Sequence, residues 1–205
     1  DALFVSDGSQ SVGALPFSIK DIQPDALICA GYKWLFGPYG CAYGYFGPYF
    51  DNGKPIEQNW ANRLDSENLS GLTAYQSEYK PKANRYAVGE SGSFIYIQMQ
   101  TAALKEILKI DSEEFQAYCH SVTEKTLNKL SAIGFESDQP SARAKHLFGI
   151  KIPKSVNTET LKTELKANNI HLSFRGKYMR VSCHLFNNET HFEKLFKVIN
   201  SVVNG

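Results

Sequence analysis

The chain has 205 residues, of which 42% are hydrophobic, and a formal net charge of +1. This length allows one large or two small domains with a sizeable core. The nearly balanced charge predicts no general attraction to nucleic acid or to a membrane surface, and no apolar run approaches the roughly 18 residues that span a bilayer. The four cysteines lack metal-site spacing, which predicts reduced thiols and a cytoplasmic location.

Two short apolar runs near the start, residues 2–5 and 25–30, are predicted to be buried strands. The segment between them is long enough for the crossover that parallel strands need. Parallel strands end at the same edge of a sheet, where open α/β sheets bind their ligands. Asp7 follows the first strand and Lys33 follows the second, so we expect both side chains at that edge. A third strand is predicted over residues 41–47, and the Gly-Pro-Tyr-Gly turn before it allows a reversed direction.

Residues 48–92 are polar, aromatic and rich in glycine and proline, without a clear periodicity. A loop region of this length is more often functional or interfacial than idle. Two helices are predicted after it, over residues 95–108 and 112–133, the second ending at Gly134.

The rest of the chain alternates between strand and helix patterns. Its predicted elements are a strand at 146–153, a helix at 157–169 capped by Asn157 or Thr158, paired strands at 170–176 and 178–186, and an amphipathic helix at 188–203. The predicted fold class is therefore α/β, with residues 1–110 forming one domain and residues 111–205 a small α+β domain.

Asp7 and Lys33 together suggest a specific chemistry. A nucleophilic lysine must be partly desolvated or shifted toward its neutral form. Enzymes that use pyridoxal phosphate pair a lysine, bound to the cofactor as a Schiff base, with an acidic partner on the pyridine nitrogen, which helps the ring accept electrons from the substrate Cα. Gln10, one short turn beyond Asp7, can donate to the phenolic oxygen of this cofactor. Taken singly, Asp7-Gly8 also fits an ordinary turn, and Lys33 an ordinary solvated lysine.

The stretch "SDGSQSVGALPFSIKDIQPDALICAGYKWLFGPYGCAYGYF" resembles the cofactor segment of the class V aminotransferase-like family, which belongs to fold-type I pyridoxal-phosphate enzymes. The family includes cysteine desulfurases, selenocysteine lyases, kynureninases and isopenicillin epimerase-like proteins. Its pattern of an aspartate, a nearby glutamine or histidine, a turn glycine and a lysine before Gly-Pro-x-Gly is present as Asp7, Gln10, Gly13 and Lys33. The resemblance implies that residues 1–110 are the C-terminal part of the large cofactor-binding domain, with a mostly parallel sheet, and that Lys33 holds pyridoxal 5'-phosphate.

Two later stretches extend the resemblance. "RYAVGESGSF" is similar to the family segment that reaches the neighbouring subunit's cofactor, which implies a homodimer and makes Ser91 a candidate phosphate contact; the alternative is a plain loop serine. "MRVSCHLFNNETHFEKL" is similar to the small-domain motif in which an arginine forks onto the substrate α-carboxylate, a role that falls to Arg180. As an isolated residue, Arg180 also fits a strand-edge charge. Arg175 is a possible second anion contact on the adjoining strand.

The sequence also departs from the family. Desulfurases often have serine and histidine at the positions of Ala30 and Tyr32, where both help to hold the phosphate; the Tyr32 phenol can still donate, whereas Ala30 cannot. Desulfurases also carry a nucleophilic cysteine on a loop shortly before the carboxylate-binding arginine. Residues 170–179 contain no cysteine, and Cys183 is expected to pack in a strand, which disfavours a persulfide-forming desulfurase.

We therefore predict a pyridoxal-phosphate-dependent enzyme that acts on a small amino acid by transamination or by lyase chemistry at Cα or Cβ. The alternative enzyme is a cysteine desulfurase or selenocysteine lyase-like protein that does not use the usual loop cysteine. In the family, the lysine lies near the middle of a longer chain, so the sequence is expected to be the C-terminal half only. A catalytically silent fragment that serves as a structural or interaction module is the alternative from a different class.

Overall fold

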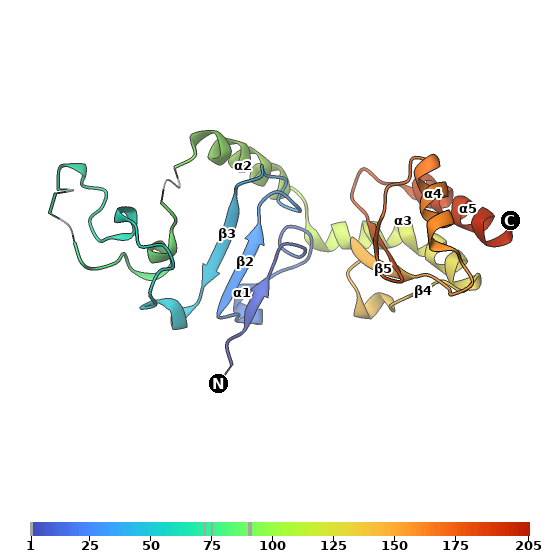
Figure 1. The fold of residues 1–205 in the computed structure, drawn as a ribbon, viewed down its shortest axis with the longest axis horizontal. Helices are drawn as coiled ribbons and strands as arrows, with labels where there is room; N and C mark the ends of the chain where they lie inside the picture. The colour runs from blue at the N-terminus through green and yellow to red at the C-terminus, as the bar shows by residue number, and fades with distance from the viewer. Residues whose placement is uncertain (1, 72, 75, 90–91) are drawn as a thin grey trace. The chain divides into compact units, whose positions relative to one another are not determined.

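The structure is a computed structural model that describes residues 2–71, 73–74, 76–89 and 92–205. Its contacts divide the chain into two compact units, residues 1–109 and 110–205, and each is described by itself (Figure 1). Among the described helices, none is both long enough and apolar enough to cross a membrane.

The first unit contains a three-stranded sheet in the order β1 (Val5–Asp7), β2 (Ala26–Ala30) and β3 (Ala42–Phe46) (Figure 1). The short helix α1 (Ile19–Ile22) lies in the crossover between β1 and β2, which are parallel. β3 runs antiparallel to β2, as the turn before it allows. The parallel pairing confirms that Asp7 and the residues that follow Ala30 leave the sheet at the same edge.

The first strand differs from its prediction in position and in burial. It begins at Val5 rather than at residue 2, and Val5 is 59% exposed. β1 is the edge strand of the three, so apolar residues there do not indicate burial. β2, at the centre, is mostly buried as expected: Ala26, Leu27 and Cys29 are buried, whereas Ile28 is exposed.

The described part of the segment between β3 and the next helix is largely irregular, as predicted. It contains the short 3₁₀ helices η1 (Pro48–Phe50), η2 (Trp60–Asn62), η3 (Leu69–Gly71) and η4 (Lys82–Tyr86). The ring of Tyr86 stacks on Phe46 with a centroid distance of 4.5 Å, and its hydroxyl donates to the Phe50 carbonyl. The helix that follows, α2 (Phe94–Ile107), completes the first unit and matches the predicted helix to within one residue at each end.

The second unit packs three helices with a four-stranded antiparallel sheet. Its elements are α3 (Ser112–Ala132), β4 (Glu136–Ser137), η5 (Pro140–Ala142), β5 (Leu147–Lys151), α4 (Thr158–Ala167), β6 (Ser173–Arg175), β7 (Tyr178–Ser182) and α5 (Glu189–Asn204), with the sheet order β4-β5-β7-β6. All the predicted helices and strands of this half are present, whereas the two-residue strand β4 was not expected.

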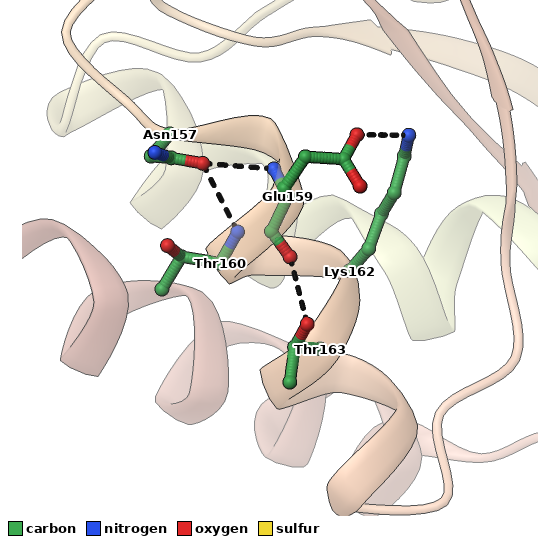
Figure 2. Close-up of polar contacts among 5 residues, drawn as sticks. All are labelled: Asn157, Glu159, Thr160, Lys162 and Thr163. Atoms are coloured by element: carbon green, nitrogen blue, oxygen red, sulfur yellow. Dashed lines mark hydrogen bonds and ion pairs between the residues drawn. The ribbon is translucent and has the colours of Figure 1, made fainter.

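Helix α4 shows how the local sequence sets an element boundary. The side-chain oxygen of Asn157 accepts the backbone N–H groups of Glu159 and Thr160 at 2.9 and 3.1 Å (Figure 2), so Asn157 rather than Thr158 is the N-cap. The Lys162 ammonium pairs with the Glu159 carboxylate at 2.7 Å one turn later, and the Thr163 hydroxyl donates to the Glu159 carbonyl.

The alternation of side chains along β7 fixes the place of Arg180. Met179 and Val181 are 0% and 2% exposed and belong to the core of the second unit. Because successive residues of a strand point to opposite faces, Arg180 lies on the other face of the sheet. Its neighbours across the strand pairs are Gly149 on β5 and Ser173 on β6.

Candidate functional site

Residues 31–41, here called the lysine loop, connect β2 to β3. The Gly31 N–H donates to the Cys41 carbonyl at 2.9 Å, and the Gly37 N–H donates to the Gly31 carbonyl at 2.8 Å. The first bond joins the two ends of the loop, and the second closes its first part, residues 31–37. Lys33 lies on the closed part, with its side chain neither fully buried nor fully exposed.

Ser9 connects the ends of the two parallel strands. Its backbone N–H donates to Oδ1 of Asp7 at 2.9 Å, and its Oγ accepts the Ala30 N–H at 3.0 Å. The residue is 9% exposed, although it lies in the turn after an exposed strand. One buried serine therefore positions the carboxylate that follows β1 and the backbone that leads into the lysine loop.

The pKa of Asp7 is lowered from its ordinary value of 3.8 by the groups around it. A hydrogen bond from the Ser9 side chain is the largest cause, and the bond from the Ser9 backbone N–H is the next. Burial opposes these two bonds by raising the pKa of Asp7, and the positive charge of Lys33 lowers it by a smaller amount. Asp7 is therefore an ionised carboxylate at neutral pH, with Lys33 close enough to act on it.

The turn after Asp7 is attached to the lysine loop through Gln10 and Gly13. The indole N–H of Trp34 donates to Oε1 of Gln10 at 2.9 Å, so the amide nitrogen is the group through which Gln10 can donate. Gly13 has a φ of +88°, and a Cβ there would lie 2.7 Å from the Trp34 carbonyl oxygen. Glycine is thus needed at position 13 both for the backbone conformation and for the close approach of the loop.

Tyr32 is also on the lysine loop and is 39% exposed. Its ring stacks on that of Tyr39 with centroids 4.3 Å apart, and Nζ of Lys33 lies 5.9 Å from the Tyr32 ring centre. The first unit therefore brings together four of the predicted site residues: Asp7, Gln10, Tyr32 and Lys33. Ser91 lies outside the described residues.

Arg180 is in the second unit and has an unusual environment there. Its Nε is buried, and no described residue offers it a hydrogen-bond acceptor. Buried polar groups are nearly always paired, so an unpaired donor on a guanidinium calls for an explanation. A carboxylate ligand would supply the missing acceptor, because it accepts two parallel N–H bonds from arginine.

The cysteines of the second unit do not form a nucleophilic site. Cys119 and Cys183 are both 0% exposed, and the Cys183 N–H donates to the His146 carbonyl at 2.7 Å. A hydrogen bond with Cys119, together with burial, raises the pKa of the Cys183 thiol far above its ordinary value. Cys183 is therefore a neutral thiol that packs in the core as predicted, although it follows β7 rather than lying within the strand.

An α/β fold with a carboxylate and a lysine at the same edge of parallel strands is the arrangement of fold-type I pyridoxal-phosphate enzymes. Residues 1–189 match the family model of aminotransferase class-V, and the chain belongs to this family. This match confirms the resemblance and the predicted fold class.

Individual relatives agree with this assignment. The chain is 26% identical to hercynylcysteine sulfoxide lyase of Schizosaccharomyces pombe, over 95% of this chain and 50% of that protein. Its fold is similar to that of a cysteine desulfurase from Thermococcus onnurineus NA1, with a TM-score of 0.81, 19% identity and coverage of 100% and 53%. It is also similar to the cystine C–S lyase C-DES, solved with its product cysteine persulfide, with a TM-score of 0.74, 20% identity and coverage of 92% and 49%. The chain thus spans about half the length of these relatives.

The family is pyridoxal-phosphate-dependent, and the described residues fit the ring of this cofactor better than its phosphate. The Asp7 carboxylate, the Gln10 amide nitrogen and the Lys33 amine are the kinds of group that the ring nitrogen, the phenolic oxygen and the aldehyde carbon of this cofactor would need. For the phosphate, the lysine loop offers the phenol of Tyr32, whereas Ala30 has no polar side-chain atom.

Sequence reasoning did not identify Ser9 or Trp34 as parts of this site. A signal for Ser9 was available, because an aspartate that accepts the N–H of the residue two positions later forms a common turn. Nothing local marks Trp34, since its partner Gln10 lies 24 residues earlier in the chain.

Replacing Ser9 with alanine is expected to raise the pKa of Asp7 toward its ordinary value. Since the folded-state pKa of Asp7 is depressed, its contribution to stability is present above the unfolded pKa of about 3.8 and is lost as the pH falls through the folded value. The free energy of unfolding that Ser9→Ala loses should therefore be larger near pH 6 than below pH 3. A second loss, of about 1–3 kcal/mol, is independent of pH because the Ala30 N–H loses its acceptor.

Carboxyl NMR titration of Asp7 and urea unfolding at both pH values measure these two effects without added cofactor. Ser11→Ala is the matched control, because the Ser11 hydroxyl lies in the same turn but donates to the Gly8 carbonyl. An unchanged Asp7 titration in Ser9→Ala would show that Ser9 does not control this carboxylate.

Proposed function

We propose that the protein is a pyridoxal-phosphate-dependent lyase that breaks the Cβ–S bond of a cysteine-derived amino acid. The observation that carries the cofactor part of this proposal is the ionised Asp7 beside Lys33 at the end of parallel strands. When bound, pyridoxal phosphate supplies an aldehyde that combines with amines and a ring that accepts electrons.

The proposed roles follow from the position of each side chain. Lys33 would hold the cofactor through Nζ and, once the substrate amine takes its place, would remove the proton from the substrate Cα. Asp7 keeps the ring nitrogen protonated, and the Gln10 amide donates to the phenolic oxygen. Arg180 receives the substrate α-carboxylate, which would pair its unsatisfied Nε. Ser91 and the Tyr32 phenol are proposed as phosphate contacts.

The cysteine environments support a lyase over a desulfurase. Elimination from a cysteine derivative breaks the Cα–H and Cβ–S bonds and releases the sulfur group with a proton, as a thiol from a thioether, a persulfide from cystine or a sulfenic acid from a sulfoxide. The remaining carbon skeleton gives pyruvate and ammonia after one water is added. This elimination needs no enzyme thiol, whereas desulfuration leaves sulfur on an enzyme cysteine. All four cysteines lie in the described part of the chain, and Cys41 alone among them is not buried. The names of two relatives, hercynylcysteine sulfoxide lyase and cystine C–S lyase, point the same way.

The desulfurase alternative has one observation in its favour. Cys41 is partly exposed and belongs to the same loop as Lys33. If sulfur were transferred to the enzyme, this is the described thiol that could accept it. The product distinguishes the two reactions, because a desulfurase releases alanine and a lyase releases pyruvate.

The decisive experiment uses the whole protein reconstituted with pyridoxal phosphate. Cystine, cysteine and S-substituted cysteine sulfoxides are supplied, and pyruvate, ammonia, alanine and keto acids are quantified. Pyruvate and ammonia in equal amounts support the lyase; alanine with persulfide on Cys41 supports the desulfurase; a keto acid without ammonia indicates transamination. Borohydride reduction followed by peptide mapping should place the cofactor on Lys33. A cofactor that never attaches there would overturn the enzyme proposal.

A two-fold homodimer is proposed as the active assembly, with the segment 48–92 at the interface. Its support is the exposure of large apolar residues in that segment, among them Tyr49 at 65% and Leu69 at 67%. Sedimentation of the whole protein, with and without cofactor, measures the oligomeric state.

A further inference from the structure

Gln100 is a buried polar residue of helix α2 whose side-chain amide lies against the lysine loop. It is 4% exposed, and its Nε2 donates to the Leu35 carbonyl at 3.4 Å, across 65 residues of sequence. Its Oε1 is buried as well, and no described group donates to it. Gln100 shares the least exposed side of the helix with Ile107, where an apolar residue would be expected.

The lysine loop leaves room for this amide by having two glycines. A Cβ on Gly31 would lie 2.7 Å from Oε1 of Gln100, and a Cβ on Gly37 would overlap the same oxygen. Neither glycine has a backbone conformation in the left-handed region, since the positive-φ glycines of the chain are at other positions. Space for the Gln100 side chain, rather than backbone freedom, therefore accounts for glycine at position 37. At position 31 the Cys41 carbonyl oxygen, which would lie 2.9 Å from a Cβ, excludes a side chain as well.

Gln100 thus touches the loop on both sides of Lys33. Gly31 precedes the lysine by two residues, Leu35 follows it by two, and Gly37 follows it by four. Burying an unpaired amide oxygen is unfavourable, and a methionine of similar length would fill this space without that cost. What the amide adds is its bond to the Leu35 carbonyl, which fixes the loop against α2.

We propose that Gln100 is a positioning residue that holds the lysine loop against helix α2 and thereby sets the position of the Lys33 amine. Its functional consequence rests on the function proposed above, whereas its effect on the loop does not. Without the amide, the loop should open more often, and Lys33 should meet the cofactor aldehyde in the correct geometry for a smaller fraction of the time.

The first test measures the loop itself in the whole protein, without cofactor. Hydrogen exchange of the backbone amides of residues 31–37 is compared between wild type and Gln100→Met. We expect exchange to be about tenfold faster in Gln100→Met, because opening of the loop breaks the bonds of Gly31 and Gly37. Gln98→Met is the matched control, as Gln98 is an exposed glutamine of the same helix, and it should exchange like wild type.

A double-mutant cycle tests the contact in case Gln100→Met folds poorly. Gly37→Ala should strongly lower the melting temperature of wild type, because the new methyl group overlaps Oε1. In a Gln100→Ala background the same change should be much milder, since the obstructing amide is gone. Equal effects of Gly37→Ala in both backgrounds would overturn the inference.

A functional test measures how readily the cofactor attaches covalently to Lys33, and how kcat and KM change separately. We expect Gln100→Met to bind cofactor about tenfold more weakly at Lys33 and to lower kcat with little change in KM, while Gln98→Met does neither. Faster loop exchange with unchanged attachment and kcat would overturn the positioning role, and unchanged exchange would overturn the whole inference.

The positioning role of Gln100 can still be tested if the proposed function is wrong. If wild type never attaches cofactor at Lys33, the labelling rate of the Lys33 amine by a small acetylating reagent replaces that readout. A changed rate in Gln100→Met, but not in Gln98→Met, would still support the positioning role, and equal rates would overturn it.

Discussion

Alanine in place of Lys33 is expected to lower turnover of every amino-acid substrate by about 10³-fold or more in the reconstituted whole protein. The substitution removes the amine that holds the cofactor and, with it, the group proposed to move the proton at Cα. Borohydride reduction should no longer attach cofactor to the peptide that contains residue 33. Steady-state assays of pyruvate release, together with peptide mapping, measure both effects.

Lys20→Ala is the matched control for this substitution. Lys20 is an exposed lysine of α1 in the same unit, and its loss should leave turnover unchanged. The melting temperature should also change little in Lys33→Ala, because the side chain is only partly buried and has no described ion pair. Small primary amines added to Lys33→Ala should restore part of the activity. Undiminished turnover in this variant would remove the basis of the proposed chemistry.

The elements that could be predicted from sequence are those with a local physical cause. Asn157 caps α4 because its side chain reaches two N–H groups of the first turn, and Gly134 ends α3 because its φ is +90°. The apolar run of β2 predicts a central strand, as observed. The prediction for β1 starts at residue 2 rather than at Val5 and expects a buried strand, whereas β1 is mostly exposed. An exposed edge strand has no buried face to fix its position in the sequence.

The site could be predicted only in part, for a similar reason. The order of strand, crossover and strand placed Asp7 and Lys33 at one edge, and the parallel pairing of β1 and β2 confirms it. The residues that position these two groups act over long sequence distances: Ser9 reaches Ala30, and Gln100 reaches Leu35. No periodic pattern records such contacts, since they depend on how the elements pack.

Replacing Arg180 with leucine is expected to lower kcat/KM for amino-acid substrates by about 10²-fold or more, because the substrate carboxylate loses a bidentate partner. The protein itself should not be destabilised: Nε of Arg180 is buried without an acceptor, so leucine removes an unfavourable burial rather than a hydrogen bond. Function and stability should therefore change in opposite directions at this position. Kinetics and urea unfolding of Arg180→Leu measure the two quantities.

Two comparisons separate carboxylate binding from a general effect of the Arg180 substitution. An amine substrate that lacks the α-carboxylate should react equally slowly with wild type and Arg180→Leu, because neither can use the missing contact. Arg175→Leu should have a small effect, since Arg175 is exposed at the end of β6 and its Nη1 donates to the Phe174 carbonyl. Equal losses for substrates with and without the carboxylate, or a larger loss in Arg175→Leu, would assign carboxylate recognition to another residue. The buried, unpaired Nε of Arg180 would then need a different acceptor.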